Sequence, residues 1–153
     1  MNLIDHLEQS HQVQRELLLA CDTDLSSFEE FRNELLWHVE EEESVLFTTL
    51  LALKVCTKDL KAAWAEHAKT LAHLQELDKL PMGTKYWNEK FIEFKAGHLA
   101  HLEEEEEDFF PVVRRSVEGK ILRDLKRTLK KKKAPAVIIY PPKPGAHADS
   151  AHS

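Results

Sequence analysis

Apolar residues recur every three or four positions along most of this chain, which is the spacing of one face of an α-helix. Breaks in the pattern, including Pro81 and Gly83, separate four long predicted helices from one another and from a shorter fifth. Their ranges are 2–22, 27–53, 57–80, 85–115 with a kink at Pro111, and 117–132. Because the connections are short, consecutive helices are expected to be antiparallel neighbours. The pattern therefore predicts an all-α fold, namely an up-down-up-down antiparallel four-helix bundle with a short C-terminal extra helix and an extended tail.

The end of the chain differs in composition from the rest. The shorter helix ends in a lysine-rich stretch, and the residues after it contain four of the six prolines. We expect three regions: a bundle over 1–116, a basic C-terminal helix over 117–133 and an extended or disordered tail over 134–153. Lysines at a helix C-terminus complement the helix dipole, and the alternative is a docking patch for a protein partner through the basic helix and tail.

Composition and charge exclude several classes of protein. A net charge of −6 over 153 residues argues against nucleic-acid binding. No apolar run approaches the roughly 18 residues needed to span a membrane, and the N-terminus becomes charged too early for a signal peptide. Cys21 and Cys56, without a CxxC motif, provide neither a disulfide framework nor a zinc ribbon. We therefore expect a cytoplasmic protein without a membrane or nucleic-acid partner.

The segment AGHLAHLEEEEEDFFP, residues 96–111, contains five consecutive glutamates after two histidines. At about 100° per residue, His98, His101 and Glu105 share one apolar stripe of the predicted helix, while the other four glutamates of the run are expected on the surface. Burying a carboxylate and two imidazoles on such a stripe is costly unless something pairs with them. A metal ion is a common reason for that arrangement.

The second predicted helix repeats this arrangement in HVEEEE, where His38 and Glu42 are four residues apart on the apolar stripe. Glu41 is the second choice for the carboxylate. A histidine and a glutamate one turn apart suit a histidine that binds one metal ion and a carboxylate that bridges to another.

The first and third predicted helices supply further histidines. His11 lies on the apolar side of the first helix, at the level of the second helix's candidates, whereas His6 lies too far along the axis. His67 lies on the apolar face of the third helix, and His73 is rotated about 120° away from it. The candidate metal ligands are His11, His38, Glu42, His67, His101 and Glu105, with His98 as a conditional seventh.

This number of imidazole and carboxylate ligands suits two octahedral-type ions such as iron or manganese better than tetrahedral zinc. The alternative is that each histidine is a hydrogen-bonded core residue without a metal. A lone histidine on an apolar face usually has that role. Four histidines and two glutamates at one level of a bundle instead favour a carboxylate-bridged dinuclear site.

The order histidine, His-x3-Glu, histidine, His-x3-Glu resembles the pattern of the hemerythrin-like HHE cation-binding family. Four segments carry the resemblance, which covers about residues 2–115: IDHLEQSHQVQREL, HVEEEESVLF, AEHAKTLAHL and HLEEEEEDFFP. The resemblance implies a hemerythrin-like bundle with a non-haem di-iron centre. The ligands that it implies are His11, His38, Glu42, His67, His101 and Glu105.

Two positions differ from the oxygen-carrying hemerythrins. Leu71 stands where their third helix has a second histidine, and Glu105 stands where their fourth helix has an aspartate. These differences argue against reversible oxygen carriage. The related iron-centre repair proteins also have paired His-x3-Glu motifs, together with an N-terminal cysteine-containing segment that this sequence does not show.

Several functions remain open at this point. The first is a di-iron protein that binds or senses oxygen, nitric oxide or peroxide. The alternatives are a redox enzyme acting on hydrogen peroxide or nitric oxide, and iron storage or iron-centre repair under oxidative or nitrosative stress. An interaction protein whose metal occupancy is reported to a partner is a further alternative. The oligomeric state is not decided by the sequence.

Overall fold

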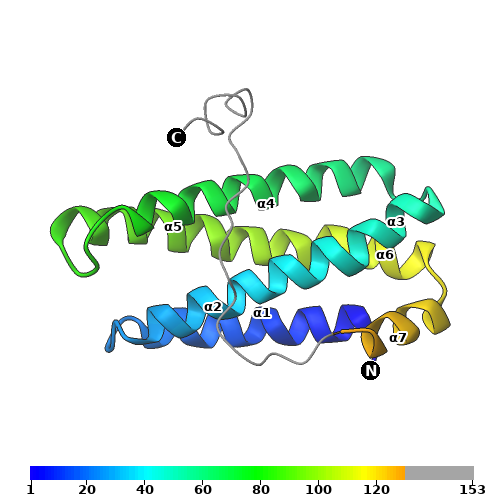
Figure 1. Ribbon diagram of the computed structural model, residues 1–153, viewed down its shortest axis with the longest axis horizontal. Helices are drawn as coiled ribbons and strands as arrows, with labels where there is room; N and C mark the ends of the chain where they lie inside the picture. Colours follow the sequence, from blue (N-terminus) through cyan, green and yellow to red (C-terminus); the bar gives the residue numbers. More distant parts are fainter. Residues whose placement is uncertain (130–153) are drawn as a thin grey trace, which may run out of the picture.

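The computed structural model describes residues 1–129, and within this range every regular element is helical. Four long helical segments lie side by side as a bundle, and a short helix follows them (Figure 1). The long segments are α1 (Leu3–Ala20); α2 (Ser27–Glu41) with η1 (Glu42–Phe47) and α3 (Thr48–Leu53); α4 (Thr57–Asp78); and α5 (Lys85–Glu104) with η2 (Glu105–Phe109) and α6 (Phe110–Ser116). The predicted all-α class is confirmed for these residues. The expected tail, 134–153, lies outside the described residues.

Two of the long segments are interrupted by π-helical turns, η1 and η2, which the sequence pattern did not predict. Each turn begins at a glutamate, Glu42 or Glu105, that lies four residues after a histidine. Single π-helical turns inside α-helices are frequent at functional sites. Pro111, where the sequence predicts a kink, lies in the first turn of α6, which directly follows η2. No proline accompanies η1, so the proline alone does not explain these turns.

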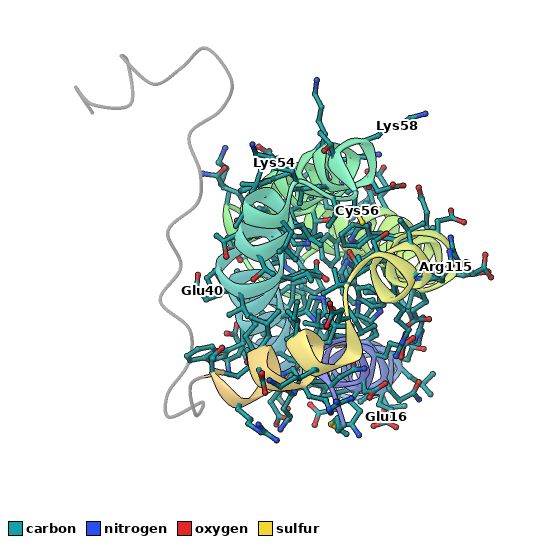
Figure 2. All side chains as sticks on the ribbon, turned by 90° about the vertical axis from the view of Figure 1, so that its right-hand side faces the viewer. Glu16, Glu40, Lys54, Cys56, Lys58 and Arg115 are labelled. Atoms are coloured by element: carbon teal, nitrogen blue, oxygen red, sulfur yellow. The ribbon has the colours of Figure 1, made fainter. Side chains whose placement is uncertain are left out.

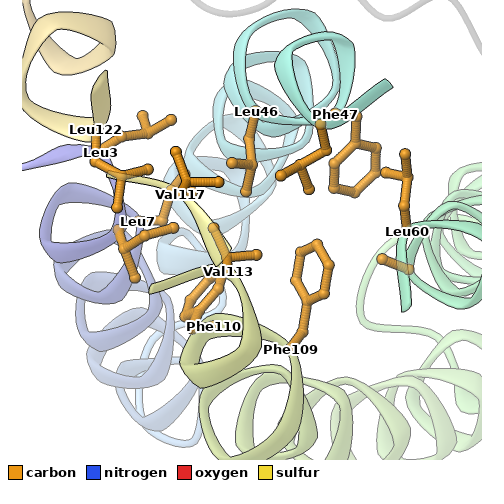
Figure 3. Close-up of a cluster of buried hydrophobic side chains, with 13 residues drawn as sticks. Leu3, Leu7, Leu46, Phe47, Leu60, Phe109, Phe110, Val113, Val117 and Leu122 are labelled. Atoms are coloured by element: carbon orange, nitrogen blue, oxygen red, sulfur yellow. The ribbon is translucent and has the colours of Figure 1, made fainter. Parts of the chain in front are cut away.

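The apolar interior consists of two clusters. The first contains Leu3, Ile4, Leu7, Leu46, Phe47, Leu50, Leu60, Ala63, Phe109, Phe110, Val113, Val117 and Leu122 (Figure 3). The second contains Leu18, Cys21, Phe28, Phe31, Leu35, Val39, Leu71, Leu74, Leu77, Trp87, Phe91 and Phe94.

Buried polar residues separate the two clusters along each long segment. On α1, for example, His11 falls between Leu7 of the first cluster and Leu18 of the second. On α4, His67 falls between Ala63 and Leu71 in the same order. The order is reversed on the second and fourth segments, so all four segments contribute to one polar layer inside the bundle.

The short helix α7 (Gly119–Arg127) packs against α1 and belongs to the bundle core through Leu122 (Figure 2). It is shorter than the predicted 117–132. Val117 is buried but has an extended backbone, with φ −122° and ψ 131°, so the helix begins only after it. Thr128 caps the C-terminal end, where Lys126 and Arg127 complement the helix dipole. Within residues 1–129, no helix has both the length and the apolar character needed to cross a bilayer.

Candidate metal centre

Two groups of three residues in the polar layer could each hold a metal ion. His11, His38 and Glu105 form one group, and His67, His101 and Glu105 form the other. Within each group, one ligand atom per residue lies within 4.8 Å of the others. Because Glu105 belongs to both groups, the two candidate positions are adjacent and share a carboxylate.

The two groups contain one histidine pair each, His11 with His38 and His67 with His101. Both predicted carboxylates lie between these pairs. Glu42 Oε1 lies 2.5 Å from His67 Nε2, and Glu42 Oε2 lies 3.4 Å from His38 Nε2. Glu105 Oε1 lies 3.0 Å from His11 Nε2 and 3.6 Å from His38 Nε2, and its Oε2 lies 3.7 Å from His101 Nε2. A carboxylate with one oxygen toward each pair has the disposition of a bridging ligand between two ions.

The two predicted carboxylates are buried, as the helical phase predicted. Glu42 and Glu105 are 0% and 3% exposed, while Glu103, Glu104 and Glu107 are exposed. Oε2 of both buried glutamates lacks a hydrogen-bond partner among the described residues. An ionised carboxylate oxygen left without a partner in a protein interior is costly, and a bound cation removes that cost. The donor set therefore fits a metal ion of the kind that accepts both imidazole and carboxylate ligands.

Electrostatic interactions inside the layer couple its histidines to its carboxylates. Burial alone would lower the pKa of His38 and His67, but Glu42 together with other nearby carboxylates, Glu105 among them, outweighs burial and raises the two pKa values to about 9 and about 10. Burial would raise the pKa of Glu42, but the two histidines hold it well below its usual value. Without metal ions, protons on these imidazoles thus balance the buried carboxylates. A metal ion must displace such protons before an imidazole nitrogen can bind it.

His98, the conditional seventh ligand, lies outside both groups. Its Nε2 lies 2.7 Å from Oε1 of Gln14, which can only accept, so Nε2 carries the proton. Nδ1 is buried without a hydrogen-bond partner. Burial lowers the pKa of His98 well below its usual value, and the neighbouring His101 adds to that effect. The ring is therefore a neutral group next to the candidate ligands.

Glutamates that follow the two bridging candidates orient histidines of other helices. His11 Nδ1 donates to Glu106 Oε2 at 2.8 Å, and His67 Nδ1 donates to Glu43 Oε2 at the same distance. Arg15 fixes Glu106 through two hydrogen bonds of 2.9 and 2.6 Å. A carboxylate that accepts the Nδ1 proton favours the ring tautomer in which Nε2 is unprotonated and can bind a metal ion.

Glu106 corrects the sequence-based expectation that all glutamates of the run except Glu105 are surface residues. Its side chain is only 24% exposed. Burial would raise its pKa, but Arg15 and His11 together lower it. Its angle on the helix, beside the apolar stripe, gave a weak signal, but the partner on α1 could be identified only from the structure.

The rejected alternatives lie apart from both groups. Glu41, the second choice to Glu42, is buried but pairs with His6 at 3.0 Å. His73 is exposed. Glu42 and Glu41 are therefore both buried but contact different histidines, and His67 is buried whereas His73 is exposed.

Aromatic rings pack against the histidines and separate them from solvent. Phe47 stacks on His67 with 5.0 Å between ring centroids, and Phe110 stacks on His11 at 5.4 Å. Phe47 and Phe110 belong to the first apolar cluster, in which Figure 3 draws them. On one side the layer is open. A cavity of about 90 Å³ between α4 and the α5–η2 segment reaches His101 and Glu105.

Comparison with known protein families gives one match. The profile of the hemerythrin HHE cation-binding domain matches residues 2–113, which include every residue of the two groups. Comparisons with curated proteins and with solved structures gave no significant match.

Proposed function

The chain belongs to the hemerythrin HHE cation-binding domain family, and we propose that it is a non-haem di-iron protein that binds or senses oxygen, nitric oxide or peroxide. The observation that carries this proposal is the pair of histidine groups that share Glu105, with Glu42 placed between His38 and His67 although it belongs to neither group. The proposed ligands are His11, His38, Glu42, His67, His101 and Glu105. His98, whose ring centroid lies 6.2 Å from that of His101, is the conditional seventh. Iron is preferred to manganese as the metal.

Two iron ions would supply reversible one-electron oxidation and an open coordination position for a small molecule. The chain contributes the surroundings of that chemistry. Glu106 and Glu43 keep the rings of His11 and His67 in one orientation. Phe47 excludes water beside His67, so that the buried charges interact strongly.

We also propose the up-down-up-down antiparallel topology that short connections favour, with 1–116 as the metal-binding unit. The reversed order of the two apolar clusters on successive segments supports that topology. The basic segment over 117–133, which contains α7, and the predicted tail over 134–153 remain the candidate surface for a protein partner. A cytoplasmic location and the absence of a nucleic-acid partner remain predictions.

The proposal predicts about two iron ions per chain after expression with added iron, because six ligands are too many for one ion that keeps an open position. Elemental analysis measures this number. The anaerobically reduced protein is then exposed separately to oxygen, nitric oxide and peroxide while its absorption spectrum is recorded. A spectral change that reaches completion at about one ligand per iron pair supports a binding or sensing protein. A single zinc ion per chain would contradict the proposal.

A redox enzyme acting on peroxide or nitric oxide is the second candidate function, and His98 favours it. The buried Nδ1 of this neutral imidazole has no hydrogen-bond partner among the described residues and can accept a hydrogen bond from a substrate such as hydrogen peroxide. The same spectral experiment separates the two functions when peroxide is added in excess. Consumption of many equivalents per iron pair would indicate turnover, whereas consumption of one would indicate binding or a single oxidation.

Replacing Glu106 by alanine is expected to weaken metal affinity by roughly 10- to 100-fold, because the ring of His11 loses the carboxylate that orients it. Glu106→Gln should weaken it less, since an amide oxygen still accepts from Nδ1. The matched control is Glu103→Ala, which removes an exposed glutamate from the same helix. Competition with a chelator of known affinity measures the difference. Equal affinities of the Glu106→Ala and Glu103→Ala proteins would show that the contact does not position the ring.

A further inference from the structure

The cavity that reaches the candidate centre has an acidic lining. It lies between α4 and the α5–η2 segment, and its volume is about 90 Å³, enough for several water molecules. Four carboxylates line it beside Glu105: those of Asp59, Glu66, Glu104 and Asp108. Among the described residues, no lysine or arginine lines it.

Two of the proposed ligands, Glu105 and His101, also line the cavity. Glu105 lines it, and the Oε2 atom of this 3% exposed residue has no hydrogen-bond partner. His101 lines it as well, and at 11% its side chain is the most exposed of the six proposed ligands. Glu66 lies 3.7 Å from His101 Nδ1, so an acidic side chain stands directly outside the proposed ligand.

We propose that this cavity is the port through which divalent cations enter the centre, with Glu104 and Asp108 as carboxylates that attract the cation before it reaches Glu105. The inference rests on the proposed function, since the cation must have the buried histidine groups as its destination. It adds a role for residues that are not ligands.

The charge of the lining favours a cation over the small ligands of the centre. A cleft lined by one sign of charge concentrates the field and raises the rate at which oppositely charged ions arrive. Oxygen, nitric oxide and hydrogen peroxide are uncharged, and carboxylates give them no such advantage. His11 and His67 are less accessible than His101, since they are 0% and 2% exposed and are stacked against phenylalanines.

The acidic run contains a matched pair of variants for the test. Glu104→Gln with Asp108→Asn neutralises two exposed residues that line the cavity. Glu103→Gln with Glu107→Gln neutralises two exposed residues of the same run that do not. Both changes are four residues apart on one helix, and both alter the net charge from −6 by the same amount. Neither pair includes a proposed ligand.

The measurement is the rate at which metal-free protein takes up Fe²⁺ under anaerobic conditions, with Co²⁺ as a spectroscopic check. In low salt, the cavity variant should load roughly tenfold more slowly than the control variant, and the difference should shrink in high salt, where charges are screened. The final iron content should equal that of the unmodified protein. Nitric oxide binding to the loaded proteins should proceed at equal rates, because this ligand is uncharged.

Three results would overturn the port without contradicting the proposed function. Full loading at equal rates in both variants would show that the lining plays no part, while leaving the di-iron proposal intact. Equal slowing in both variants would assign the effect to net charge. Slower nitric oxide binding in the cavity variant alone would indicate a change in shape. Failure of the unmodified protein to take up iron would contradict the proposed function itself, and the port with it.

Discussion

Glu105→Ala is expected to reduce the iron content from about two ions per chain to one at most, the largest loss for any single change in the acidic run. Glu105 is the only residue that belongs to both groups of potential ligands within the described part of the chain. Its Oε1 lies 3.0 Å from His11 Nε2, and its Oε2 lies toward His101. Truncation to alanine therefore removes a ligand from both metal positions together.

The matched control for this variant is Glu107→Ala. Glu107 lies in the same π-helical turn but is exposed, so its loss should leave about two irons in place. Iron content is measured by elemental analysis, and helical content by circular dichroism shows whether each variant folds. Two retained irons in Glu105→Ala, or a loss in Glu107→Ala, would mean that the carboxylate of the fourth segment does not bind the metal.

A second comparison tests the bridging geometry. His101→Ala removes a ligand that belongs to one group only, so it should cost one iron and leave the group of His11, His38 and Glu105 able to bind. If neither His101→Ala nor Glu105→Ala retained any iron, the two positions would be strictly interdependent. A greater loss for Glu105→Ala agrees with a shared carboxylate between two partly independent positions.

Helical periodicity was sufficient to identify Glu105 within a run of identical residues. Burial of one face depends only on the 100° step between neighbours, and Glu105 is buried while Glu104 and Glu107 are exposed. The same rule selected Glu42 and His67. The sequence predicts the burial of these residues because the apolar residues that define the buried face lie within a few turns of the same helix.

Contacts between helices could not be predicted in this way. Glu106 lies beside the stripe, and its role depends on Arg15 and His11, more than 90 residues away in sequence. Gln14 likewise meets His98 across 84 positions. Such pairs are fixed by the rotation and offset of one helix against another, which single-helix periodicity does not contain.

The π-helical turns show a second limit of periodicity. A uniform 100° step assumes that the residues after Glu42 and Glu105 keep the same angular positions around the helix axis. A π turn has i→i+5 hydrogen bonds, and it therefore rotates the later residues of the helix about that axis. On the fourth segment, Phe109 and Val113 still reach the first cluster after the shift. The wider π turn is stabilised by contacts of the packed site, and the spacing of residues along one helix does not predict those contacts.

Removing the metal is expected to lower the melting temperature by about 10 °C or more. A ligand present at about a thousand times its dissociation constant stabilises the folded state by roughly 4 kcal/mol, and for a protein of this size 1 kcal/mol corresponds to about 2–4 °C. Without the metal, the buried oxygens Glu42 Oε2 and Glu105 Oε2 would have no hydrogen-bond partner among the described residues. Protons on His38 and His67 replace part of the lost positive charge, so we expect a weakened fold, not an unfolded chain.

Thermal unfolding of the iron-loaded and the chelated protein, followed by circular dichroism, measures this difference. Glu105→Ala is the internal control, because a protein that holds one iron at most should lose less stability when chelator is added. If chelation left the melting temperature of the unmodified protein unchanged, the imidazoles and carboxylates of the layer would be satisfied by one another. The layer would then be an ordinary polar core that needs no cation to balance its two carboxylates.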